Sequence, residues 1–137
     1  VGSVDKMIKL KDLLVEITYT KPNFEFEWEE AIRYPELKSL GKKTWIELAK
    51  NGTDVKYSEI KDDLANVDLN FDKLETPKKQ RFYSAFKNAV IETPIVLRNS
   101  NWTEEGEKEY DLLGGNTRIA GLVKHGIDPT LWVVDIS

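Results

Sequence analysis

Residues suited to binding chemistry are concentrated in one short stretch, Gly114-Gly115-Asn116-Thr117-Arg118. It follows an apolar run and precedes a helical pattern in which Ile119, Leu122 and Val123 share a face, so we expect a strand, a tight turn and a helix. The glycines permit positive φ angles and a close approach of the backbone to a ligand. The amides of residues 116–119 lie in the first helical turn, at its positive end, and Arg118 adds a forked donor. The stretch therefore predicts an anion site that suits phosphate.

Two other interpretations of the same stretch remain open. The glycines could serve only to let a strand and a helix pack closely. Arg118 could form a structural ion pair with a carboxylate such as Asp111.

This stretch and its surroundings resemble the ParB/sulfiredoxin superfamily. The similarity covers the turn, the Ile-Ala pair after it, a Gly-Ile loop, the last strand at 131–134, and Thr93-Pro94-Ile95-Val96-Leu97, which is similar to the family's Pro-Ile-Val strand. Members of the family carry a Gly-x-x-Arg turn before a short helix, and the turn holds the phosphates of a nucleotide. The resemblance implies an α/β (α+β) fold, a small mixed sheet with packed helices, in a single domain over residues 1–137.

The resemblance also implies phosphate contacts on an earlier helix. Sulfiredoxin-like members present a basic residue and two hydroxyls at positions i, i+3 and i+7 of that helix. Aligning the apolar stripes puts Arg81, Ser84 and Asn88 at these places, with Asn88 replacing a hydroxyl. The alternative for these three residues is a solvated polar face.

Two departures from the family limit the activities that it implies. Asn116 stands where sulfiredoxins carry a cysteine, which excludes their redox chemistry. Chromosome-segregation members carry Glu-Arg-Arg where this chain has Asn116-Thr117-Arg118, which argues against a partition clamp. Other relatives are kinases that phosphorylate a hydroxyl of a small molecule. We therefore expect a domain that binds a nucleoside triphosphate, ATP or CTP with Mg²⁺, and hydrolyses it or transfers its phosphoryl group; the alternative is a non-catalytic ParB-like interaction or DNA-associated module.

Phosphoryl transfer also needs a carboxylate that orients the attacking hydroxyl. The sequence assigns no catalytic residue, but Asp72, Asp111 and the pair Glu29-Glu30 are candidates. No cysteine and a single histidine, His125, leave carboxylates as the protein ligands for a metal. The metal expected with such ligands is Mg²⁺ that is shared between the carboxylates and the bound phosphates.

Composition narrows the class of protein. A chain of 137 residues is long enough for one domain with its own core. The net charge of −4 does not attract nucleic acid, so DNA binding would require a partner or a local basic patch. The sequence has no long apolar run and no signal-peptide core, and it lacks cysteine, so we expect a cytoplasmic protein with no membrane segment.

The elements that must position the anion site follow from hydrophobic periodicity. Strands are expected near 6–10, 94–98, 109–113 and 131–136, with helices over 77–90 and 117–125 packed on them. Residues 16–70 are predicted to form a helical insertion beside the sheet, after an irregular connection at 17–26. This insertion would be either a cap over the nucleotide site or a contact surface for another chain. Ala120 and Gly121 are expected to be small because their helix lies close over the sheet.

Overall fold

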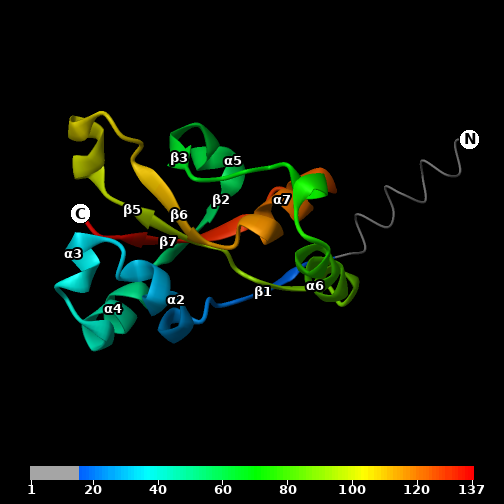
Figure 1. The fold of residues 1–137 in the computed structure, drawn as a ribbon, viewed down its shortest axis with the longest axis horizontal. Coiled ribbons are helices and arrows are strands. Elements are labelled where there is room, and N and C mark those ends of the chain that lie inside the picture. The colour runs from blue at the N-terminus through cyan, green and yellow to red at the C-terminus, as the bar shows by residue number, and fades with distance from the viewer. Residues whose placement is uncertain (1–15) are drawn as a thin grey trace, which may run out of the picture.

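The computed structural model describes residues 16–137, and the strand expected near 6–10 lies outside them. Its strands are β1 (Thr18–Thr20), β2 (Thr53–Lys56), β3 (Leu64–Ala65), β4 (Val90–Glu92), β5 (Ile95–Arg98), β6 (Tyr110–Gly114) and β7 (Thr130–Asp135). Its α-helices are α2 (Phe24–Ala31), α3 (Pro35–Lys38), α4 (Lys42–Ala49), α5 (Tyr57–Ile60), α6 (Thr76–Lys87) and α7 (Asn116–Lys124). Single-turn or longer 3₁₀ segments are η1 (Lys61–Asp63), η2 (Phe71–Lys73) and η3 (Ser100–Glu105). The described chain is therefore a mixed α/β structure (Figure 1).

The described strands form two sheets. The main sheet has five strands in the order β2-β7-β5-β6-β3, and β1 pairs with β4 in a parallel two-stranded sheet. Within the main sheet β5 runs antiparallel to β6 and parallel to β7, so the sheet is mixed as expected. Ile95, Leu113 and Val133 lie in this one sheet, which confirms the expected central strands.

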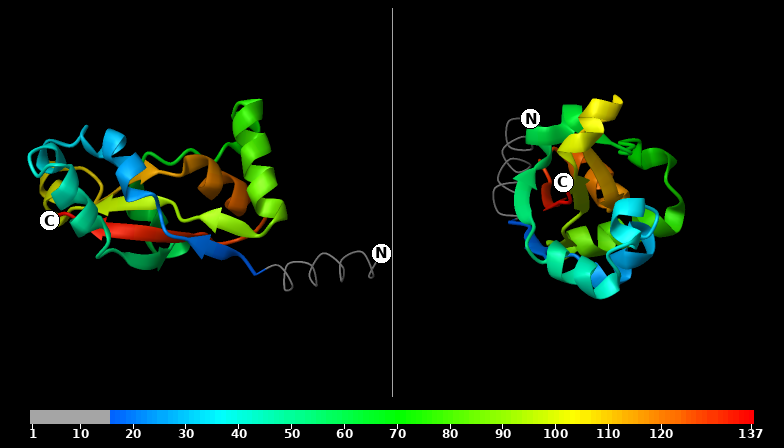
Figure 2. Two further views of the ribbon diagram at one scale, coloured as in Figure 1. Left: turned by 90° about the horizontal axis from the view of Figure 1, so that it is seen from below. Right: turned by 90° about the vertical axis from the view of Figure 1, so that its left-hand side faces the viewer.

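Alternating side chains of the central strands enter two separate cores. Ile95 and Leu97 pack in a cluster with Trp45 of α4, whereas Val96 packs in a second cluster with Ile119 of α7. The main sheet therefore lies between a layer made of α2, α3 and α4 and a layer that contains α5 and α7 (Figure 2). Helix α6 stands at the other end of the molecule from α3 and α4 (Figures 1 and 2).

The expectation of a helical insertion over residues 16–70 is wrong in part. The segment does form α2 to α5, but it also supplies β1 and both edge strands of the main sheet, β2 and β3. In β2 only Val55 is half-buried, and its neighbours are exposed. Such a short edge strand is defined by its backbone pairing with β7 rather than by an apolar pattern. The predicted irregular connection at 17–26 contains β1 and the start of α2.

The expected helix 77–90 ends earlier than its apolar stripe suggested. Helix α6 stops at Lys87, and Ala89 has a φ of 55°, the left-handed conformation that often terminates helices. Val90 then begins β4, in which Ile91 is 1% exposed. Val90 and Ile91 are both β-branched, which favours a strand after the turn at Ala89. This strand brings Glu92 to Arg118, near the start of α7.

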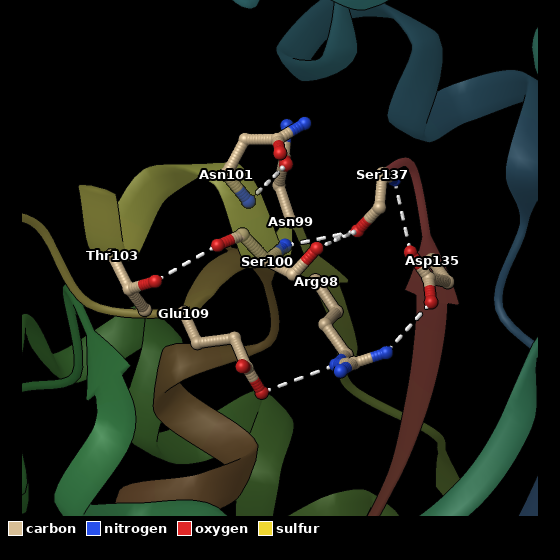
Figure 3. Close-up of polar contacts among 8 residues, drawn as sticks. All are labelled: Arg98, Asn99, Ser100, Asn101, Thr103, Glu109, Asp135 and Ser137. Atoms are coloured by element: carbon tan, nitrogen blue, oxygen red, sulfur yellow. Dashed lines mark hydrogen bonds and ion pairs between the residues drawn. The ribbon is translucent and has the colours of Figure 1, made fainter. Parts of the chain in front are cut away.

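One end of the central strands is held together by Arg98, at the end of β5 (Figure 3). Its Nε donates to Glu109 Oε2 at 3.1 Å, and its Nη1 donates to Asp135 Oδ2 at 2.8 Å. Beside it, the amide of Ser100 donates to Ser137 Oγ at 2.9 Å. These charged residues are bonded to one another, so we interpret them as structural.

No helix in the described part of the chain is both long and apolar enough to cross a membrane.

Helix α7 packs against α6, and this contact explains the small residue at position 121. A Cβ placed on Gly121 would lie 2.5 Å from carbons of the Phe82 ring. The expectation that Gly121 is small because of the sheet is therefore wrong, since the close neighbour is a side chain of α6. Ala120, 0% exposed, lies in the same core cluster as Phe82 and Ile91.

Replacing Gly121 with leucine should lower the free energy of unfolding by about 1–3 kcal/mol, because the new side chain overlaps the Phe82 ring. Urea denaturation of the single variant measures this loss. In a Phe82→Ala background the ring is gone, so the leucine should cost less than it does alone. An unchanged midpoint for Gly121→Leu would show that the two helices do not pack in this way.

Candidate functional site

The turn predicted to bind an anion is formed as a strand, a left-handed glycine and a helix. Strand β6 ends at Gly114, Gly115 has a φ of 106°, and α7 begins at Asn116. The amide of Ile119 donates to the Gly115 carbonyl at 3.0 Å, and no side chain caps the helix. Among the residues that the structure describes, the amides of Asn116, Thr117 and Arg118 therefore have no acceptor. This arrangement suits an anion.

Both glycines of the turn have close neighbours. A Cβ on Gly115 would lie 2.6 Å from Pro94 Cβ, and one on Gly114 would lie 2.6 Å from Glu27 Oε2. Close packing is therefore one reason for the glycines. It does not compete with anion binding, because the same packing holds the free amides in place.

The Asn116 side chain fixes the turn from outside. Its Oδ1 accepts from the amide of Asp68 at 2.7 Å, and its Nδ2 donates to the Asp68 carbonyl at 3.0 Å. Both polar atoms thus have a partner on Asp68, and the backbone amide of Asn116 remains free to meet a ligand. The side chain acts as a brace between the turn and the loop before η2.

Arg118 is half-buried and has one carboxylate partner. Its Nη1 donates to the Glu92 carbonyl at 2.8 Å and lies 3.1 Å from Glu92 Oε2. The suggested pairing with Asp111 is wrong, because Asp111, near the start of β6, accepts from Tyr34 and Asn66 instead. Within the described chain the remaining nitrogens of Arg118 donate to no protein acceptor, so the guanidinium can still donate to a ligand.

A cleft of about 570 Å³ opens beside this turn. Its volume falls in the range of small-molecule sites. The cations Lys78 and Arg81 of α6 reach it, together with Arg118. Its lining residues are Phe26, Lys78, Arg81, Phe82, Ala85, Ile91, Glu92, Gly115, Asn116, Thr117 and Arg118.

The chain matches no protein-family model, no curated protein and no solved structure.

Of the three residues expected on the facing helix, the structure brings only Arg81 to the cleft. Ser84 and Asn88 do not line it. Asn88 is the C-cap of α6, and its Nδ2 donates to the carbonyl of Ser84 at 3.1 Å. The residues of α6 that do line the cleft are Lys78, Arg81, Phe82 and Ala85. Aligning the apolar stripes therefore places the polar set too far towards the end of the helix. Lys78 is the basic residue that this reasoning missed.

A buried carboxylate lies directly beside the turn. Glu27 of α2 is 4% exposed, although its neighbours in the helix include exposed acidic residues. Burial raises its pKa above the usual range, Glu92 reinforces the rise, and the nearby Arg118 opposes it. The sequence did contain a signal, since Glu27 occupies the same face of α2 as the buried Phe24 and Ala31.

The raised pKa of Glu27 makes a prediction about stability. A raised pKa in the folded state means that this carboxyl costs nothing below its unfolded value of about 4.3, where both states are protonated. The free energy of unfolding should fall as pH rises from there towards the raised folded pKa, because the unfolded chain releases this proton while the folded state retains it. Glu27→Gln, which cannot ionise, should melt higher than wild type at pH 7 and converge with it near pH 4.

Thermal melting between pH 4 and pH 8 tests this expectation. Glu29→Gln is the matched control, because Glu29 is an exposed glutamate on the same helix. If Glu27→Gln melts lower than wild type at pH 7, the carboxylate is stabilised by its surroundings and the assigned direction is wrong.

The carboxylates suggested by sequence lie elsewhere. Asp72 pairs with Lys124, Asp111 is bonded to Tyr34, and Glu30 pairs with Arg33 at 3.3 Å. None of them lines the cleft. Among the described residues, Glu92 is the one carboxylate that lines the cleft. The described residues contain no group of three or more His, Cys, Asp or Glu that could hold a metal ion.

A larger cleft of about 890 Å³ lies around Tyr34 and Trp102, whose rings stack at 6.0 Å. Its charged lining consists of Glu36, Glu105, Glu107, Asp111 and a single cation, Lys108. This excess of negative charge repels phosphate. The smaller, cationic cleft is therefore the candidate site.

Proposed function

We propose that the cationic cleft binds the phosphates of a nucleoside triphosphate. The observation that carries this proposal is that three cations, Lys78, Arg81 and Arg118, line the same cleft as the start of α7 with its free amides. The start of α7 offers backbone N–H donors, and Arg118 offers a planar guanidinium that can donate two hydrogen bonds. Helix α6 adds the positive charges of two flexible side chains, Lys78 and Arg81. The ligand's phosphates would lie against residues 115–118.

We also propose that the fold is of the ParB/sulfiredoxin-like type. The features that support it are the parallel pairing of β5 with β7 and the Gly-x-x-Arg turn between β6 and α7. The strands added by residues 16–70 at both edges of the main sheet would then be elaborations of that core.

Glu92 would give the site a proton acceptor. Arg118 is paired with Glu92 at 3.1 Å, and phosphate would compete with this carboxylate for the guanidinium. A Glu92 side chain released from Arg118 would remain in the cleft beside the phosphates. It could then accept the proton of an attacking water or hydroxyl.

In the catalytic form of the proposal, the attacking oxygen bonds to the γ-phosphorus, and the bond from that phosphorus to the β–γ bridging oxygen breaks. The nucleoside diphosphate leaves with the bonding electrons, and the proton of the attacking group passes to Glu92. Arg118 and the amides of α7 stabilise the charge on the phosphate oxygens. Mg²⁺ would be held by the phosphates and by water rather than by Glu92, and when bound it would supply charge neutralisation.

The second candidate is a binding module that holds the nucleotide without consuming it. The observation that favours it is that Glu92 is already engaged by Arg118, through both its backbone carbonyl and its carboxylate. A carboxylate held in this way is not positioned to take a proton from an attacking group. Association with DNA would then require a partner, or the patch formed by the same three cations.

Calorimetry with ATP, CTP and GTP, each with and without Mg²⁺, tests the proposal, and product analysis by ³¹P NMR separates the two candidates. Binding with release of nucleoside diphosphate supports the enzyme, whereas binding without turnover supports the module. If no nucleotide binds wild-type protein at millimolar concentration, the phosphate site does not exist.

A further inference from the structure

The rim of the cationic cleft carries an aromatic ring that the fold does not use. Phe26 is 66% exposed, whereas the other large apolar side chains at the described surface are 40–43% exposed. It lines the same cleft as Arg118 and Arg81. A largely exposed ring beside three cations offers a flat apolar face to a ligand in the cleft.

The backbone holds Phe26 in this position. The amide of Phe26 donates to the side chain of the N-cap residue Asn23 at 3.0 Å. The first residue of α2, Phe24, is anchored as well, because the Trp45 ring nitrogen donates to its carbonyl at 2.8 Å in the core. Phe24 and Glu27 point into the protein, which leaves Phe26 on the outer side of α2. The ring is therefore presented by a fixed helix start rather than by a loop.

The lining of the cleft contains both apolar and cationic residues. Its apolar side chains are Phe26, Phe82, Ala85 and Ile91, and of these Phe26 is by far the most exposed. A ligand that uses both the exposed ring and the cations has a flat apolar group joined to a polyanion. Inorganic polyphosphate would use only the cations and the free amides, and an uncharged aromatic compound only the ring.

We infer that Phe26 is the stacking platform for the base of the bound nucleotide, so that the ligand is recognised through its base as well as its phosphates. This inference rests on the proposed function and names the ligand class more narrowly. Aromatic stacking accepts any base, because every base has a π-face. The platform would therefore select nucleotides over inorganic polyphosphate without strong discrimination among bases.

The test compares ATP with inorganic tripolyphosphate by calorimetry on wild type and on Phe26→Ala. We expect Phe26→Ala to weaken ATP binding about fivefold to a hundredfold, the range for loss of one stacked base, and to leave tripolyphosphate binding unchanged. Phe26→Trp, which keeps an aromatic face, should bind ATP as wild type does. Leu69→Ala, at another exposed apolar side chain, is the matched control for surface truncation.

The outcomes separate this inference from the proposed function. If tripolyphosphate binds and Phe26→Ala leaves ATP affinity unchanged, or weakens both ligands equally, the stacking role is overturned while the phosphate site stands. If neither ligand binds wild type, the phosphate site fails and the stacking role fails with it.

Discussion

Replacing Arg118 with alanine is expected to weaken nucleoside triphosphate binding about tenfold to a hundredfold. A charge-assisted hydrogen bond to phosphate is worth about 1.5–3 kcal/mol, which corresponds to this change in affinity. Arg118 is 23% exposed in its side chain, so its contact to an anion is screened less than that of a surface residue. Calorimetry with ATP measures the change directly.

Arg118 also bonds the Glu92 backbone, so the variant's fold must be checked by circular dichroism and thermal melting. Arg118→Lys retains the charge but not the planar fork, and it should fall between wild type and alanine. Arg33→Ala is the matched control, because Arg33 is a surface arginine that pairs with Glu30 and does not line the cleft. A folded Arg118→Ala protein with wild-type affinity would remove Arg118 from the site.

The second large effect is expected from Gly115→Ala. An alanine at a φ of 106° is strained, and its Cβ would lie 2.6 Å from Pro94 Cβ. Strain of about 1–3 kcal/mol and a similar cost for the clash should together lower the free energy of unfolding by about 2–6 kcal/mol. The same change displaces the first amides of α7, so the remaining folded protein should bind phosphate weakly.

Gly126→Ala is the matched control for this variant. Gly126 has a φ of 76°, but a Cβ there meets no other atom within 4 Å. It should therefore show the strain without the clash and retain nucleotide binding. If Gly115→Ala is no less stable than Gly126→Ala in urea denaturation, the close approach to Pro94 does not constrain the turn.

The turn at residues 114–118 and the three central strands could be predicted because their signals are local. The double glycine interrupts an apolar run and forces a change of direction, and buried strands such as β5 are almost wholly apolar. The start of α7 could be placed to within one residue for the same reason. These elements contain the candidate anion site, so the core of the site was visible in the sequence.

Other parts of the site depend on tertiary contacts. The edge strand β2 has too little apolar alternation to be distinguished from the helical segments around it. Glu92 reaches Arg118 only because α6 ends at Lys87 and β4 follows, which the apolar stripe hid. Phe26 is one of several aromatic residues in the sequence, and only its exposure beside the cleft distinguishes it from residues of the core.

The central claim is that phosphate binds at the start of α7, and amide mapping tests it most directly. Tripolyphosphate is titrated into ¹⁵N-labelled protein, and each backbone amide is followed by NMR. The largest and saturable shifts are expected at residues 115–118, with smaller ones at Lys78 and Arg81 of α6. Saturable shifts confined to other parts of the surface, or none at millimolar tripolyphosphate, would contradict a phosphate site at this turn.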